Sequence, residues 1–212
     1  LGTAYNGIDP GEFTFVEKPG SHLAFLGRWH PEKGPHLAID IAKRAGIRLK
    51  MAAIPQDQRY FDEAIAPHID GDQIQNLGPV DRKGRNELLR GALALVHMTT
   101  RPERFGLTMV EAMACGTPVL GARTGSTPEI VVDGVTGFLC DSVLEAVSRV
   151  PDLASLSRRA CRERVESAFT VERMVERYCA YYEEALRRGI PSPAGTAQLE
   201  ARAYDWWDRP QA

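Results

Sequence analysis

Short apolar runs alternate with amphipathic stretches along most of the chain. The apolar positions change repeatedly from a continuous or two-residue pattern, typical of strands, to a period of three to four residues, typical of helices. The expected strands are 22–26, 48–53, 73–77, 93–98, 118–122 and 137–139, and the expected helices are 36–45, 60–66, 85–91, 107–114 and 128–132. Strands joined by helices pair in parallel through right-handed crossovers, which place helices on both faces of the sheet. The pattern predicts a doubly wound α/β domain with a parallel sheet of about six strands.

The pattern changes after residue 141, where only helical periodicity remains. Three further helices are expected at 143–150, 153–168 and 170–188, and their mixed Arg and Glu positions indicate that they cover the domain. A Gly- and Pro-rich linker begins at Gly189, and the chain ends in a segment that contains Trp206 and Trp207. This tail is interpreted either as a docking segment or as a frayed end. The expected organisation is a leading hinge-like segment (1–20), one domain (21–188), and a linker with a Trp-containing tail (189–212).

Composition narrows the class of protein. The chain has 212 residues, a formal net charge of -2, 43% hydrophobic residues and 25% charged residues, which is typical of a water-soluble globular protein. Its longest apolar stretch, 92–96, is far shorter than the roughly 20 residues that cross a bilayer, and no apolar leader opens the chain. A cytoplasmic location is therefore expected. The charges are interspersed, so no binding of nucleic acid is expected. The four cysteines form no C-x-x-C pair and are expected to be reduced, packed thiols.

Candidate chemistry lies in the loops that follow the expected strands, because ligands of open α/β sheets bind beyond the carboxyl ends of the strands. After the first strand, a glycine turn at Gly27 presents Arg28 and then Lys33 before a helix begins. Two cations at a strand end suit a diphosphate, since Arg can bind two oxygens and Lys acts as a mobile point charge. The alternative is a solvated loop with two surface charges.

The loop after the fourth strand contains a second candidate anion site. Gly106 allows a tight turn into a helix, so the free amides near Gly106, Leu107 and Thr108 can bind an anion. Because Pro102 and Gly106 interrupt the helical pattern, Glu103 belongs to the loop and Glu111 to the second turn of the helix. Each carboxylate could bind vicinal hydroxyls, Glu103 on a sugar and Glu111 on a ribose. The alternatives are a carboxylate that pairs with the helix dipole and a solvated helical Glu.

Several familiar motifs are absent from the sequence. It contains no G-x-G-x-x-G, G-x-x-x-x-G-K-[ST], G-x-S-x-G or H-E-x-x-H, which argues against a dinucleotide oxidoreductase, a P-loop kinase, a serine hydrolase and a zinc protease. The loop 121–129 is interpreted as a turn with Pro128 at the first helical position. The histidines at 22, 30, 36, 68 and 97 have no metal-ligand spacing and are expected to be surface residues or to fill strands. No metal site is expected.

Taken together, these motifs resemble a known enzyme family. Residues 103–119, with Glu103 and Glu111, a Phe-Gly turn and the run EAMACGTPV, resemble the E-x7-E signature of retaining family 4 glycosyltransferases. Other segments of the chain are also similar to parts of that family. Residues 27–34 resemble its diphosphate loop, 77–80 resemble its segment near the nucleotide base, 125–129 and 133–138 resemble its distal loop and last strand, and 5–9 resemble the stretch that follows its hinge. The resemblance covers roughly residues 5–188 and implies the second, Rossmann-like half of a GT-B fold.

The resemblance also implies roles for individual residues. Arg28 and Lys33 would neutralise the leaving diphosphate, and Glu103 would hold hydroxyls of the donor sugar, so these three are the implied catalytic residues. The implied nucleotide-sugar-binding set is Gly27, Arg28, Lys33, Val80, Glu103, Phe105, Gly106, Leu107, Thr108 and Glu111. Within it, Glu111 would bind the ribose and Val80 the base. The implied reaction is a retaining hexosyl transfer that needs no metal or other cofactor. One departure is the run 97–100 (His-Met-Thr-Thr), where family members commonly have a Pro-Ser pair.

The resemblance implies a partner domain as well. The chain begins with Leu and a hinge-like segment, so we expect the C-terminal, donor-binding portion of a longer enzyme and an incomplete catalytic unit. The expected partners are a nucleotide-sugar donor and a missing N-terminal acceptor-binding domain, through which any peripheral membrane contact would occur. Two alternatives remain open. One is a GT-B relative that epimerises nucleotide sugars, and the other is a non-catalytic nucleotide-binding or interaction module.

Overall fold

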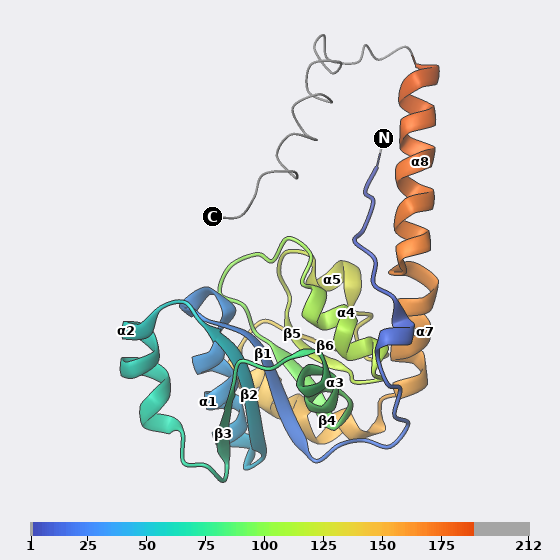
Figure 1. Cartoon of the computed structure of the whole chain (residues 1–212). Coiled ribbons are helices and arrows are strands. Elements are labelled where there is room, and N and C mark those ends of the chain that lie inside the picture. Colours follow the sequence, from blue (N-terminus) through green and yellow to red (C-terminus); the bar gives the residue numbers. More distant parts are fainter. Residues whose placement is uncertain (1, 189–212) are drawn as a thin grey trace. The chain divides into compact units, whose positions relative to one another are not determined.

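The computed structural model describes residues 2–188 of the protein (Figure 1). Residues 5–173 form one compact unit, and residues 2–4 with 174–188 belong to a second. The predicted linker and Trp-containing tail lie outside the described residues. None of the described helices is long and apolar enough to cross a membrane.

A parallel sheet with the strand order β3-β2-β1-β4-β5-β6 organises the larger unit. Its strands are β1 (His22–Trp29), β2 (Arg48–Pro55), β3 (Ile74–Gly78), β4 (Ala92–His97), β5 (Val119–Ala122) and β6 (Gly137–Cys140). All six predicted strands are therefore confirmed. The order reverses between β1 and β4, and in such sheets ligands bind in the crevice beyond the carboxyl ends of the strands at this switch point.

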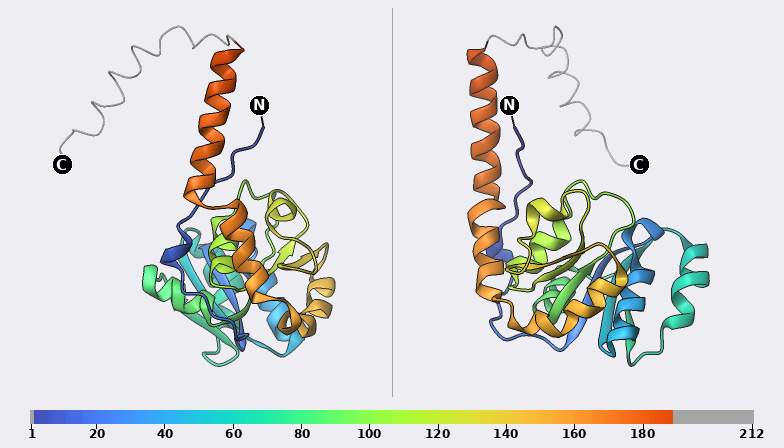
Figure 2. Two further views of the ribbon diagram at one scale, coloured as in Figure 1. Left: turned by 90° about the vertical axis from the view of Figure 1, so that its right-hand side faces the viewer. Right: turned by 180° about the vertical axis from the view of Figure 1, so that it is seen from behind.

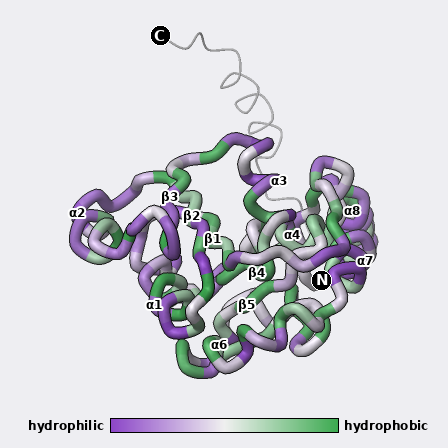
Figure 3. The backbone as a smooth tube through the Cα atoms, turned by 90° about the horizontal axis from the view of Figure 1, so that it is seen from below, coloured by the Kyte–Doolittle hydropathy of each residue, from purple (hydrophilic) through white to green (hydrophobic). Residues whose placement is uncertain are grey.

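Helices cover both faces of the sheet, as Figure 2 shows. The helices are α1 (Pro35–Ala45), α2 (Gln58–Tyr60), α3 (Arg82–Arg90), α4 (Leu107–Ala114), α5 (Thr127–Ile130), α6 (Val143–Arg149), α7 (Arg158–Ala168) and α8 (Val171–Arg187). One core contains residues of α3, α4 and α7, and the other contains residues of α1 and α6. In Figure 3, α1 and α6 accordingly lie on one side of the strands, and α3 and α4 on the other. Alternation along β1 supplies both cores, because Leu23 and Phe25 face one and Ala24 faces the other.

Two predicted helices differ from the structure in the type of helix that forms. The expected helix 153–168 is wrong at its start: Val150–Ser155 is a 3-10 helix, and α7 begins only at Arg158. The reason is local, because the Ser157 side chain accepts a hydrogen bond from the Ala160 amide and caps a new helix. The expected helix 60–66 is longer, and it consists of α2, a π-turn at Phe61–Ile65 and a 3-10 turn at Ala66–His68. Neither difference moves the strands.

A buried arginine joins several loops at the edge of the sheet. Arg158 is only 4% exposed, and among residues 2–188 it forms no ion pair. Its guanidinium donates hydrogen bonds to the carbonyls of Val16, Arg90, Ala92 and Cys115 and to the Thr117 hydroxyl. Arg158 therefore connects the segment before β1 with the start of β4 and the end of α4.

The cysteines are free thiols. Cys115, Cys140 and Cys161 are buried, whereas Cys179 is exposed. Burial raises the pKa of each buried thiol to about 12, which keeps all three protonated at neutral pH. The prediction of packed, reduced thiols is confirmed for these three residues.

Candidate functional site

Three cavities lie in a row beside the carboxyl ends of the strands. The first has a volume of about 240 Å³, the second about 300 Å³ and the third about 340 Å³. Gly27 and Thr108 line both the first and the second cavity, whereas Lys33 and Glu103 line both the second and the third. The row is therefore suited to an elongated ligand with chemically different parts.

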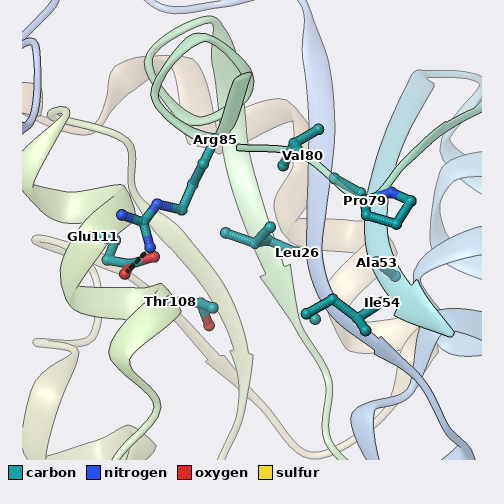
Figure 4. A pocket seen from close by; sticks show the side chains of 10 residues that line it. Leu26, Ala53, Ile54, Pro79, Val80, Arg85, Thr108 and Glu111 are labelled. Atoms are coloured by element: carbon teal, nitrogen blue, oxygen red, sulfur yellow. Dashed lines mark hydrogen bonds and ion pairs between the residues drawn. The ribbon is translucent and has the colours of Figure 1, made fainter. Parts of the chain in front are cut away.

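The first cavity has an apolar wall and a charged end (Figure 4). Its apolar residues are Leu26, Ala52, Ala53, Ile54, Pro79 and Val80. At the charged end, Arg85 donates a 2.8 Å hydrogen bond to Oε1 of Glu111. Oε2 of Glu111 is buried and has no hydrogen-bond partner among the described residues. Burial raises the pKa of the Glu111 carboxyl, and the nearby Arg85 charge opposes that shift. A flat apolar group and a hydroxyl-bearing group would fit this cavity side by side.

Arg85 is a site residue that the sequence analysis missed. It lies on α3, whose start at Arg82 precedes the predicted start because the Asp81 side chain caps the helix through the Gly84 amide. The sequence contains no local signal for the Arg85–Glu111 pair, since the partners are separated by 26 positions.

The second cavity is lined by the turn into α4 and by a lysine–carboxylate pair. Gly106 has a φ of 79°, a left-handed conformation that L side chains rarely adopt, and α4 begins at the next residue. The amides of the first helical turn lack intrahelical partners, so this end of α4 can bind an anion. Beside the turn, the ammonium of Lys33 forms an ion pair with Glu103. Burial alone would raise the pKa of Glu103, but the hydrogen bond and charge of Lys33 lower it below its usual value.

The loop 121–129 holds Glu103 in place. The Ser126 amide donates a 3.0 Å hydrogen bond to the Glu103 carbonyl, and the Ser126 hydroxyl donates one of 2.9 Å to the Phe105 carbonyl. A Cβ at Gly125 would lie 2.5 Å from the Glu103 nitrogen, so only glycine allows this contact. Pro128 was predicted at the first helical position; α5 begins one residue earlier, at Thr127, so Pro128 is its second residue. The contacts of the loop add a structural role that the sequence did not indicate.

The third cavity is polar and rich in cations. It is lined by Arg28, Lys33, Arg101 and Arg104, together with Glu32 and Glu103. Arg101 pairs with Glu32 at 3.1 Å, whereas Arg28 is exposed. Arg28 lines this cavity and is not among the residues that line the second one, where the cationic side chains are Lys33 and Arg104. The structure thus brings Gly27, Lys33, Glu103 and residues 105–108 together at one cavity, with Val80 and Glu111 at the first and Arg28 at the third.

His97 lines the second cavity as well. It ends β4, its side chain is 8% exposed, and its Nε2 lies 4.0 Å from Oε2 of Glu103. The expectation that His97 merely fills a strand is therefore incomplete. The one sequence feature that could have indicated His97 as a site residue is its place at the carboxyl end of the fourth predicted strand. Burial lowers the pKa of His97 to about 4, although the Glu103 charge acts in the opposite direction. The ring is neutral at pH 7.

Acidification is expected to destabilise the protein through His97. The folded-state pKa of about 4 lies below the ordinary 6.5, so the unfolded chain takes up the proton first. Between pH 7 and pH 5 this histidine should lower the free energy of unfolding by about 2 kcal/mol. Burial also lowers the pKa of His22 to about 4, so His22 adds a similar loss to the wild type and to His97→Gln. Urea denaturation at both pH values should therefore show a loss about 2 kcal/mol smaller in His97→Gln than in the wild type. The control His68→Gln, which replaces an exposed histidine, should retain the wild-type loss.

Comparison with known proteins assigns the chain to a family. A model described as "Glycosyl transferases group 1" matches residues 14–164. The chain belongs to this family. It is 32% identical over 194 residues to the D-inositol 3-phosphate glycosyltransferase of Mycolicibacterium smegmatis, covering 81% of this chain and 43% of that relative. The match therefore spans less than half the length of this relative.

Solved structures confirm the fold class. AviGT4, a glycosyltransferase involved in avilamycin A biosynthesis, has a TM-score of 0.71 and 28% identity over 85% of this chain and 57% of its own. Anabaena Alr3699/HepE in complex with UDP and glucose has a TM-score of 0.74 and 22% identity over 85% of this chain and 56% of its own. The predicted fold, a Rossmann-like half of a GT-B structure, is confirmed. No cluster of potential metal ligands occurs within residues 2–188.

Proposed function

We propose that this chain is the donor-binding part of a glycosyltransferase that moves a sugar from a nucleoside-diphosphate sugar to an acceptor. The observation that carries the proposal is the order of the three cavities: an apolar slot with a free carboxylate oxygen, then a helix end beside a lysine, then a cationic pocket. Membership of the group 1 family supports transfer, and the family match favours neither epimerisation nor a purely non-catalytic role. The UDP-glucose bound in another structure of HepE is a donor of this chemical class.

In the proposed complex, the first cavity binds the nucleoside. The base lies against the apolar wall at Val80, and Glu111 accepts hydrogen bonds from the ribose diol through Oε2, its unpartnered oxygen. Arg85 holds Oε1 of the same carboxylate and thereby fixes its orientation. This arrangement accounts for a buried carboxylate whose second oxygen is left unpaired.

The diphosphate and sugar occupy the next two cavities. Lys33 and the amides at the start of α4 contact the diphosphate near Gly27, with Arg28 approaching from the third cavity. Breaking the sugar–phosphate bond leaves negative charge on the diphosphate, and fixed cations and amides stabilise that charge in the transition state. Glu103, held by Lys33, binds sugar hydroxyls. The proposed transfer retains the anomeric configuration, uses no metal or other cofactor, and places the acceptor on an N-terminal domain outside this chain.

Calorimetric titration with UDP, GDP and ADP tests the proposal. The chain should bind at least one of them, and Glu111→Gln should weaken that binding by about 10-fold, because a charged hydrogen-bond acceptor is lost. The 2′,3′-dideoxy form of the same nucleotide lacks the ribose diol and should bind the wild type about as weakly as the normal nucleotide binds Glu111→Gln. Glu111→Gln should bind the dideoxy form only slightly more weakly than it binds the normal nucleotide. Glu87→Gln, an exposed change on α3, is the matched control and should bind like the wild type. Absence of heat with all three nucleotides would contradict the proposed function.

A further inference from the structure

One buried polar atom in the second cavity has no role in the fold. Nε2 of His97 is shielded from solvent and has no hydrogen-bond partner among the described residues. Buried nitrogens of this kind are nearly always paired, and an unpaired one costs free energy. Leu95, two positions earlier on the same face of β4, is buried and apolar, so an apolar residue would also suit packing here. The unpaired nitrogen therefore points to a ligand that completes it.

The position of this nitrogen indicates the direction of that ligand. An added Cβ at Gly106 would lie 3.4 Å from Nε2, so the nitrogen faces the turn that forms the cavity wall. Its other neighbour is Oε2 of Glu103, at 4.0 Å. That separation is too long for a hydrogen bond, but one oxygen atom about 2.8 Å from each of the two atoms can bridge them.

We propose that His97 Nε2 and Glu103 Oε2 together bind a single hydroxyl of the donor sugar, which makes His97 a determinant of sugar specificity. The inference rests on the proposed function. The hydroxyl donates its proton to the Glu103 carboxylate and accepts a hydrogen bond from the Nε2–H tautomer of His97. A hydroxyl can do both at once, whereas a methylene group can do neither.

The charges in the cavity support this arrangement. Lys33 keeps Glu103 ionised, so that the carboxylate acts as an acceptor only. Burial and the Lys33 charge keep the His97 ring neutral, and in its Nε2–H tautomer the neutral ring donates to a hydroxyl oxygen without adding a charge beside the sugar. A sugar that lacks this hydroxyl would leave Nε2 of His97 unpaired and Glu103 with Lys33 alone as its charged partner, which is an effective means of rejection.

Separating the binding of the sugar from that of the nucleotide tests the inference. Dissociation constants of UDP, of UDP-glucose and of its singly deoxygenated analogues are measured for the wild type, His97→Phe and His97→Gln. If the chain binds GDP or ADP in place of UDP, GDP-mannose or ADP-glucose and their deoxygenated analogues replace these probes. His97→Phe keeps the ring shape but removes the donor, and His97→Gln restores a donor of similar reach.

We expect UDP affinity to change less than 2-fold in both variants and UDP-glucose affinity to fall about 10-fold in His97→Phe, with partial recovery in His97→Gln. One deoxy analogue should bind the wild type about 10-fold more weakly than UDP-glucose and should lose nothing further in His97→Phe. Equal losses for UDP and UDP-glucose, or no loss for either, would overturn the role of His97 and leave the proposed function intact. Failure of the wild type to bind any nucleotide would overturn both. Thermal unfolding of each unliganded variant verifies folding, and His97→Asn replaces His97→Phe if the latter does not fold.

Discussion

Replacing Lys33 with alanine is expected to weaken nucleoside-diphosphate binding by roughly 100- to 1,000-fold, which corresponds to about 3–4 kcal/mol. Two effects add. A charge-assisted hydrogen bond to phosphate, of about 1.5–3 kcal/mol, is lost. In addition, Glu103 loses its partner, and its unneutralised carboxylate repels the phosphate from a partly buried position. Isothermal titration calorimetry with the nucleotide that the wild type prefers measures the change.

A double variant separates the two effects. Lys33→Ala combined with Glu103→Gln removes the repelling charge as well, so it should recover part of the affinity that the single change loses. Lys18→Ala, an exposed change in the segment before β1, is the control and should bind nucleotide like the wild type. A loss of less than 5-fold in Lys33→Ala would show that this lysine does not contact the diphosphate.

Arg158→Met should lower the free energy of unfolding by about 3–5 kcal/mol. The guanidinium donates to four backbone carbonyls and one hydroxyl, and methionine fills a similar volume without donating to any of them. Removing a buried cation also relieves its desolvation cost, which lowers the pKa of Arg158 in the folded protein. The relief is smaller than the cost of several unpaired buried carbonyls. Urea denaturation at pH 7 measures the difference.

The control for Arg158→Met is Arg59→Ala, because the Arg59 side chain is 86% exposed and, within residues 2–188, pairs only with Glu63 on its own helical segment. Its effect should stay within about 0.5 kcal/mol. Arg158→Lys should fall between the two, since one ammonium cannot reach partners on all sides. If Arg158→Met were no less stable than Arg59→Ala, the cost of the buried charge would equal the value of its hydrogen bonds.

Local signals predicted the elements best where the chain carries clear breaks. The boundaries of α4 match the predicted helix 107–114, because Gly106 precedes it and Gly116 and Pro118 follow it. All six strands were predicted from their short apolar runs. The continuous helix predicted at 153–168 was wrong because the amphipathic pattern continues through Ser157, and a single serine cap was enough to begin a new helix there.

The site residues likewise divide into those that local sequence signals indicated and those that only the fold brought together. The sequence by itself determined that Gly27, Arg28 and Lys33 follow one strand and that Glu103 and the start of α4 follow another, since these are properties of neighbouring positions. Only the tertiary structure decided which side chains meet. Lys33 lies 70 positions from Glu103, and Arg85 lies 26 positions from Glu111. Such pairs form because the strand order places β1 beside β4, and because packing fixes how far each helix turns its side chains toward the edge of the sheet. The unpaired nitrogen of His97 is likewise a result of packing, because no pattern of neighbouring residues indicates whether a buried atom will have a partner.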